Sequence, residues 1–244
     1  MYNLIKGIVR RVIPAGLLAK HEYPLRSIIA IRYRGKRYRC NICGYGLRAF
    51  VRFNDEELLC PRCGSSSRAR RLYMLLENEV NPGEKILHFS PSGAIRREYE
   101  SKSNIEYSTT DYAGEFMADK CIDITDIDES DNAYDRIICY HILEHIEEDK
   151  KAMMELFRIL KPGGCCLIQT PFREKMFEDQ SIIAREDRLI NFGQEDHVRI
   201  YSVEGLQNRL TEHGFMVEVL LMNGDTDEYY GLYPGEYILK ACKP

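Results

Sequence analysis

Four cysteines in this chain have the spacing of a metal site. Two C-x2-C pairs are separated by 16 residues, and their members are Cys40, Cys43, Cys60 and Cys63. Four thiolates complete a tetrahedral sulfur shell for Zn²⁺ and leave no open coordination position. The pattern therefore predicts a structural zinc ribbon over residues 40–64, with a redox dithiol as the alternative. A glycine follows each pair, Gly44 and Gly64, as a turn with positive φ requires.

Two carboxylates lie at or after predicted strands. Asp111 comes 22 residues after Phe89, the end of the first predicted strand of the body. In nucleotide-binding folds a carboxylate at this position accepts hydrogen bonds from the ribose hydroxyls. Asp123 lies where a carboxylate accepts from an adenine amino group. The alternative for each is an ordinary turn or helix-cap residue.

The elements that position these residues alternate between strands and helices. Apolar runs predict strands at 85–89, 105–110, 121–125, 134–140, 165–170, 215–222 and 236–243. Amphipathic stretches at 147–160 and 203–214 predict helices between them. The pattern predicts an α/β fold, a doubly wound, mostly parallel, seven-stranded Rossmann-like sheet. Residues 171–202 interrupt the alternation after the fifth strand, and a connection of this length is usually functional.

We expect three segments along the chain. Residues 1–39 form a basic helix followed by a strand at 27–39, residues 40–64 form the ribbon, and residues 65–244 form the body with its substrate-side insertion, 171–202. The remaining cysteines lie in or beside apolar runs, which predicts buried thiols: Cys121, Cys139, Cys165, Cys166 and Cys242.

Charge divides the chain unevenly. Residues 1–71 carry 16 Lys and Arg against 4 Asp and Glu, whereas residues 72–244 carry 18 against 34. A basic front on an acidic body suggests an anionic partner such as a lipid surface or RNA, or docking of the front onto the body itself. No apolar run reaches 18 residues and no cleavable leader is evident, so we expect a cytoplasmic protein without a transmembrane segment.

Residues 134–172 resemble the fourth strand, helix and fifth strand of class I S-adenosylmethionine-dependent methyltransferases. The resemblance is carried by H-x-L-E-H at 141–145 and by K-P-G-G at 161–164 before an apolar strand, and it extends over about 85–243. A methyltransferase body behind a zinc ribbon is similar to a bacterial subgroup associated with glycan and cell-envelope synthesis. The resemblance implies S-adenosylmethionine as cofactor and cofactor contacts from His88, Phe89, Ser90, Pro91, Ser92, Gly93, Asp111, Tyr112, Asp123, Ile124, Cys139 and Tyr140.

The first loop departs from the family pattern. His88 stands where the family usually has Asp, and Ser90 and Ser92 replace two glycines. The carboxylate expected near the cofactor amino group is therefore missing, although Ser hydroxyls and backbone N–H groups could substitute for it.

Two histidines are candidates for the general base. His141 follows the fourth predicted strand, and His197 lies in the insertion, where Asp196 or Glu195 could orient it and Arg199 could bind an anionic acceptor group. An ordinary solvated loop is the alternative for the insertion. The stretch 141–145 also matches H-x-x-E-H, an inverted zinc-protease signature, which its position at a strand-to-helix turn disfavours.

We therefore expect a methyltransferase acting on a hydroxyl or amine of a small molecule or glycan. Two alternatives remain: an RNA methyltransferase that docks nucleic acid on the basic ribbon, and a non-catalytic binding protein with a degenerate cofactor site.

Overall fold

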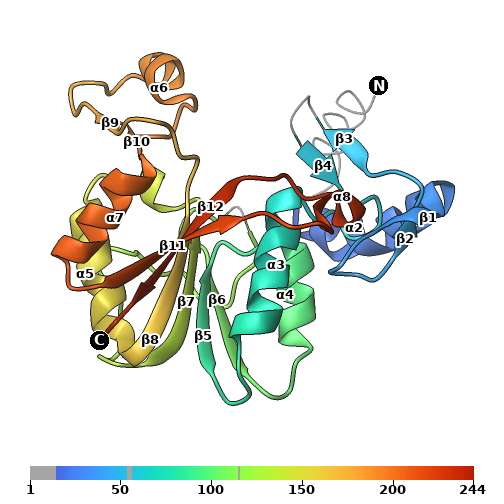
Figure 1. The fold of residues 1–244 in the computed structure, drawn as a ribbon, viewed down its shortest axis with the longest axis horizontal. Coiled ribbons are helices and arrows are strands. Elements are labelled where there is room, and N and C mark those ends of the chain that lie inside the picture. Colours follow the sequence, from blue (N-terminus) through green and yellow to red (C-terminus); the bar gives the residue numbers. More distant parts are fainter. Residues whose placement is uncertain (1–14, 54–56, 115) are drawn as a thin grey trace. The chain divides into compact units, whose positions relative to one another are not determined.

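A computed structural model describes residues 15–53, 57–114 and 116–244 (Figure 1). The described chain forms two compact units. The first includes the described residues up to Glu79 together with Gly93–Glu98 and Gly224–Tyr233, and the second comprises Val80–Ser92, Tyr99–Asn223 and Pro234–Pro244. These units group residues by contact, whereas the boundaries at 39/40 and 64/65 follow sequence pattern and stay a prediction.

The first unit is built from short elements. Its strands pair as two antiparallel ribbons, β1 (Arg34–Arg39) with β2 (Gly46–Leu47) and β3 (Val51–Phe53) with β4 (Glu57–Leu59). Its helical elements are α2 (Ala15–Ala30), η1 (Ile31–Tyr33), α3 (Ser67–Glu79) and α8 (Asp227–Tyr230), and α4 (Gly93–Glu100) begins in it.

The predicted strand at 27–39 is wrong in its first half. Helix α2 continues to Ala30 and η1 follows, so the strand begins only at Arg34. The Ser27 hydroxyl donates to the Tyr23 carbonyl one turn earlier, at 2.9 Å, as a helical residue does. Ile28 and Ile29 are 67% and 57% exposed, so their β-branched side chains have no pleated surface to pack against.

A mostly parallel six-stranded sheet forms the centre of the second unit, as expected for a Rossmann-like fold. The strand order is β11-β12-β8-β7-β5-β6. The first four strands along the sequence run parallel, and β12 and β11 complete the sheet antiparallel. The bounds are β5 (Lys85–Phe89), β6 (Glu106–Thr110), β7 (Tyr134–Tyr140), β8 (Leu160–Gln169), β11 (Met216–Met222) and β12 (Glu236–Cys242).

Both faces of this sheet carry buried side chains. Helices α5 (Asp149–Ile159) and α7 (Val203–Glu212) cover one face, where α5 residues such as Leu156 and α7 residues such as Leu206 join the sheet residues in one apolar cluster (Figure 1). Ile86 and Ile138 of the opposite face are also buried. Sheets buried on both faces read as continuous apolar runs, which is why these strands were recognisable in the sequence.

The predicted strand at 121–125 does not form, so the sheet has six strands and not seven. An isolated bridge to β6 forms at Lys120, just before this segment, and pairs it with Thr110. Side chains take over its amide groups: Ile122 N–H donates to the Thr110 hydroxyl at 3.0 Å, and Thr125 N–H donates to the Asp123 carboxylate at 2.8 Å. These local bonds compete with a strand ladder, while Ile122 and Ile124 still enter the core.

The insertion after β8 has secondary structure of its own. It contains β9 (Phe177–Glu178), α6 (Arg185–Phe192) and β10 (Arg199–Ile200), and β9 pairs antiparallel with β10 (Figure 1). A 3₁₀ turn, η2 (Leu143–His145), follows β7.

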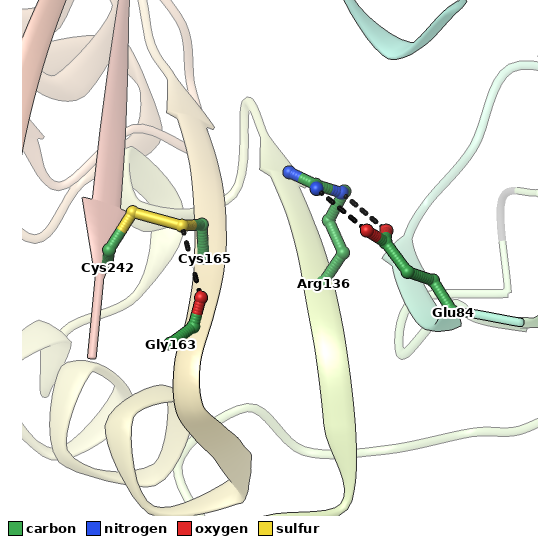
Figure 2. The surroundings of a disulfide bond; sticks show 5 residues. All are labelled: Glu84, Arg136, Gly163, Cys165 and Cys242. Carbon is green, nitrogen blue, oxygen red and sulfur yellow. Dashed lines mark hydrogen bonds and ion pairs between the residues drawn. A yellow bond between two sulfur atoms is a disulfide. The ribbon is translucent and has the colours of Figure 1, made fainter. Parts of the chain in front are cut away.

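Three of the five cysteines expected to be buried thiols are not. Cys165 on β8 and Cys242 on β12 form a disulfide, because the antiparallel register places the two residues opposite each other (Figure 2). Cys121 is exposed, whereas Cys139 and Cys166 are buried as predicted. In the described ranges, no helix is both long and apolar enough to span a bilayer. The cytoplasmic location stays a prediction.

Candidate functional site

The carboxyl ends of the parallel strands bring the predicted site residues to one edge of the sheet. Phe89 of β5 is in register with Thr110 of β6 and Cys139 of β7, and Tyr140 pairs with Gln169 of β8. The residues that follow these strands therefore share an edge: Ser90, Asp111, His141 and Thr170. Open α/β sheets bind ligands at this edge.

Ser90 and Asp111 form the centre of the predicted cofactor site. The Ser90 hydroxyl donates to Asp111 Oδ1 at 2.7 Å, and Phe116 N–H donates to Asp111 Oδ2 at 3.2 Å. Asp111 is only 6% exposed. Ser90 has a φ of 47°, a left-handed conformation that favours glycine.

The other predicted cofactor residues divide into two groups. Phe89, Ile124 and Cys139 are buried in the apolar cluster, and Pro91 is also buried. Tyr112 is 68% exposed, Ser92 and Tyr140 are half-buried, and Gly93 is the exposed first residue of α4.

Asp123 and His88 form local hydrogen bonds. Asp123 accepts from both the N–H and the hydroxyl of Thr125, and these bonds lower the pKa of Asp123. His88 lies inside β5, is 2% exposed and bonds through Nδ1 to the Tyr107 hydroxyl at 2.8 Å. Burial lowers the pKa of His88 to about 3, so this imidazole is neutral. Cofactor contact by these residues stays a prediction.

The two predicted catalytic histidines both lie near Glu144. His141, with a φ of 55°, bonds through Nδ1 to Glu144 Oε1 at 3.1 Å. A ring nitrogen of His197 lies within 4.8 Å of a carboxylate oxygen of Glu144. Burial lowers the pKa of His197. Burial alone would raise the pKa of Glu144, but the bond to His141 holds it below its usual value. The general-base role stays a prediction for both histidines.

Arg199 does not have the anion-binding role expected of it. Its guanidinium is buried and donates to the carbonyls of Leu143, Ile146 and Glu147, and Val198 N–H donates to the Glu144 carbonyl at 2.9 Å. Strand β10 therefore holds the backbone of η2 and determines where Glu144 lies.

An open depression of about 800 Å³ lies at the end of β8. Its lining includes Gln169, Thr170, Phe172, Ser202, Glu236 and Tyr237. Gln169 Oε1 and Thr170 Oγ1 are buried oxygens without a hydrogen-bond partner among the described residues. His141 N–H donates to the Gln169 carbonyl, so the depression adjoins the His141 end of β7. Sequence reasoning missed Gln169 and Thr170, although their place at the end of the fifth strand was a signal.

The four ribbon cysteines converge in the first unit. Cys40 and Cys63 sulfurs lie 3.6 Å apart, and Cys43 and Cys60 sulfurs lie 3.8 Å apart. Sulfurs bound tetrahedrally at a Zn–S distance of about 2.3 Å would be about 3.8 Å apart, so the cluster fits Zn²⁺. Gly44 and Gly64 have φ of 67° and 77°, which confirms the predicted turns.

Two arginines of the basic front are internal. Arg70 donates to the carbonyls of Leu58, Ser65, Tyr230 and Gly231, and Arg71 forms a two-pronged pair with Asp227 at 2.8 and 2.6 Å. Both are buried, so neither guanidinium adds to an anion-binding surface.

Comparisons with known proteins agree on one family. A family model described as a methyltransferase domain matches residues 63–220. The ubiquinone biosynthesis O-methyltransferase of Rickettsia bellii (strain OSU 85-389) is 38% identical over 58 residues, which are 24% of this chain and 24% of that protein. The match therefore spans about a quarter of the curated relative's length.

Solved structures support the fold. A methyltransferase in complex with the Trm112 activator from Haloferax volcanii has a TM-score of 0.52 at 13% identity, covering 72% of this chain and 91% of that one. Phosphoethanolamine N-methyltransferase 2 of Haemonchus contortus, bound to S-adenosyl-L-methionine, has a TM-score of 0.51 at 16% identity, covering 72% and 52%. An S-adenosylmethionine-dependent methyltransferase from Mesorhizobium loti has a TM-score of 0.50 at 15% identity, covering 71% and 98%.

Proposed function

Because this chain belongs to the methyltransferase domain family, we propose that it binds S-adenosylmethionine at the carboxyl edge of its sheet and methylates a hydroxyl or amine of a small, polar acceptor of glycan type. S-adenosylmethionine supplies a methyl group already activated on a sulfonium. The protein then has to align the acceptor, exclude water and remove a proton. Alignment of this kind contributes about 7–11 kcal/mol to lowering a barrier.

The observation that carries the proposal is the Ser90–Asp111 pair beside the end of β7. A buried carboxylate held by a hydroxyl and a backbone amide suits a pair of ribose hydroxyls. The left-handed backbone of Ser90 and His141 places strain at the ends of two adjacent strands. Backbone strain of this kind is concentrated at functional sites.

His141 is the favoured proton acceptor. Its Nδ1 bonds to Glu144, whose lowered pKa keeps the carboxylate charged. A carboxylate at Nδ1 fixes the tautomer and the orientation of a histidine base, as in a Ser-His-Asp triad. His197 is the second candidate.

The depression beside β8 supports a small acceptor. Its volume of about 800 Å³ lies within the ~300–1,000 Å³ typical of small-molecule sites. Gln169 Oε1 and Thr170 Oγ1 would gain hydrogen bonds from acceptor hydroxyls. This favours a hydroxyl-bearing small molecule over RNA, for which a long basic groove would be expected.

Calorimetric titration with S-adenosylmethionine and S-adenosylhomocysteine tests the cofactor site. We expect micromolar binding to the wild type, loss of at least tenfold in affinity for Asp111→Asn, and no change for Asp126→Asn, an exposed carboxylate of the same loop region. Absence of binding to the wild type would favour the non-catalytic alternative. Equal affinity of both variants for S-adenosylmethionine would mean that Asp111 does not bind the cofactor.

We propose in addition that the Cys40, Cys43, Cys60 and Cys63 cluster binds a structural Zn²⁺. The sulfur spacing and the two glycine turns support it. Metal sites of this type contribute folding free energy directly, so a chelator should unfold the first unit.

For the basic front we propose an anionic lipid surface as partner. Leu25, Ile28, Ile29 and Ile31 are more than half exposed, and exposed cations such as Arg32 and Arg34 follow them. Apolar and basic side chains exposed together suit a lipid interface better than RNA. The fraction of protein that sediments with phosphatidylserine vesicles should be lower for the double variant Ile28→Ser/Ile29→Ser than for the wild type. If the wild type binds RNA more tightly than it binds these vesicles, RNA is the partner instead.

A further inference from the structure

Three side chains beyond the Cys cluster converge on one point in the second unit. Glu144 and His145 come from η2, and His197 comes from the insertion just before β10. Their potential ligand atoms all lie within 4.8 Å of one another, and the two imidazole rings are 4.7 Å apart between centroids at an interplanar angle of 85°.

Each of these side chains is oriented by a second contact. His145 Nδ1 lies 3.2 Å from Asp196 Oδ2, and the buried His197 ring packs edge-on against the His145 ring. Glu144 Oε1 is bonded to His141. A ligand histidine whose second nitrogen is held by a carboxylate or carbonyl is the usual arrangement around protein-bound metals.

The second carboxylate oxygen of Glu144 is buried without a hydrogen-bond partner among the described residues. Glu144 is 1% exposed, and its Oε2 has no hydrogen-bond partner among the residues that the structure describes. A buried, charged oxygen left without a partner costs free energy, and such an atom in a native fold calls for an explanation. A cation between Glu144 and the two imidazoles would supply one.

We propose that Glu144, His145 and His197 bind a divalent transition-metal ion of the zinc class. Two imidazoles and one carboxylate are a ligand set used by zinc sites that keep an open position, and imidazole selects zinc-like ions over magnesium or calcium. This site is separate from the Cys cluster and does not depend on the proposed methyl transfer.

The assignment changes the expected role of His197. A metal ligand does not serve as general base, so His141 becomes the single candidate at this edge among the two predicted. Glu144 would then orient the proposed base through one oxygen, which bonds to His141, and bind the metal through the other.

Metal content of the full chain tests the proposal. After equilibration with Zn²⁺ and gel filtration, we expect two zinc ions per chain for the wild type and one for Glu144→Gln and for His197→Ala. Glu147→Gln, a neighbouring exposed carboxylate, and His213→Ala should retain two. One zinc in the wild type that both site variants retain, or two zinc ions in both site variants, would overturn the proposal.

Cobalt identifies which site is filled. Co²⁺ bound to the cysteines gives a thiolate charge-transfer band, which the site variants should keep while they lose the bands of the second ion. Because Asp196 is exposed, Asp196→Asn should fold and weaken binding of the second ion by roughly 10–100-fold. Unchanged affinity in Asp196→Asn, together with an unchanged cobalt spectrum in Glu144→Gln, would refute the site. No methyl donor is present, so failure here leaves the proposed methyl transfer untouched.

Discussion

At the scale of single residues, the site depends on side chains that stand in unusual backbone conformations or environments. Ser90 and His141 have left-handed φ without being glycine, at the ends of adjacent strands. Such a conformation costs about 1–2 kcal/mol per residue. The hydroxyl of Ser90 offsets part of this cost through its bond to Asp111.

Two substitutions at Ser90 separate backbone strain from the hydrogen bond. Ser90→Ala and Ser90→Gly both lose the bond to Asp111, but only glycine relieves the strain at φ 47°. We expect Ser90→Gly to be more stable than Ser90→Ala by about 1 kcal/mol in urea unfolding. A more stable alanine variant would contradict the left-handed conformation.

His88 makes stability depend on pH. Burial depresses its pKa to about 3, so between pH 6.5 and 3 the unfolded chain binds a proton that the folded chain excludes. Stability should therefore fall as the pH drops below about 6.5, by up to about 1.4 kcal/mol per unit from this residue. Denaturant titrations at pH 7 and 5 should show a shallower loss for His88→Gln; equal losses would contradict the prediction.

At the scale of elements, the insertion holds the turn after β7. Arg199 on β10 donates to three carbonyls of residues 143–147, and Val198 bonds to Glu144. The insertion, for which the sequence left an ordinary solvated loop as the alternative, is therefore anchored to the turn after β7. That residues 171–202 form one wall of the substrate site stays a prediction.

Replacing Arg199 should loosen this anchor. Arg199→Met leaves the buried carbonyls of Leu143 and Glu147 without their donor, while Arg209 still pairs with Asp149, and we expect a loss of at least roughly 1–3 kcal/mol. Arg185→Met on exposed helix α6 should change stability by no more than about 0.5 kcal/mol. Thermal unfolding of the two variants measures the difference, and similar values would refute the anchoring role.

At the scale of the whole molecule, the Cys165–Cys242 disulfide connects the last strand to β8. Figure 2 shows it beside the Arg136–Glu84 ion pair, which joins β7 to the residue before β5 at 3.0 Å. The bridge closes a segment with a sequence separation of 77 residues. The antiparallel end of the sheet is therefore fixed covalently as well as by hydrogen bonds.

Removing this bridge should lower stability without changing the fold. The chain-entropy relation gives about 4.5 kcal/mol for a loop of this length. We expect Cys165→Ser/Cys242→Ser to lose up to that amount and exposed Cys121→Ser to lose almost none. Serine variants are preferable to a reductant because the ribbon thiols would respond to it. An unchanged unfolding free energy in the double variant would mean that the bridge does not stabilise the protein.

The sequence by itself determined much of the architecture. The apolar runs at β5, β7 and β8 are buried on both faces, so hydrophobicity alone identified them. The C-x2-C pairs and their glycines determined the sulfur cluster, because spacing fixes local geometry. The position of Asp111 at the sheet edge was predictable because it directly follows a parallel strand, whereas its contact with a ribose stays a prediction.

Only the tertiary structure decided the rest. The segment 121–125 has the composition of a strand, but its amides bond to nearby side chains of Thr110 and Asp123. The Cys165–Cys242 bridge requires β12 to return beside β8 in one register. Glu144 and His145 are neighbours in the sequence, but His197 is distant from them. The contacts of Arg199 and Val198 with residues 143–147 bring His197 beside the other two. The physical reason is the same in each case: contacts between residues distant in sequence depend on strand register and on competition for hydrogen bonds, and neither is visible in local pattern.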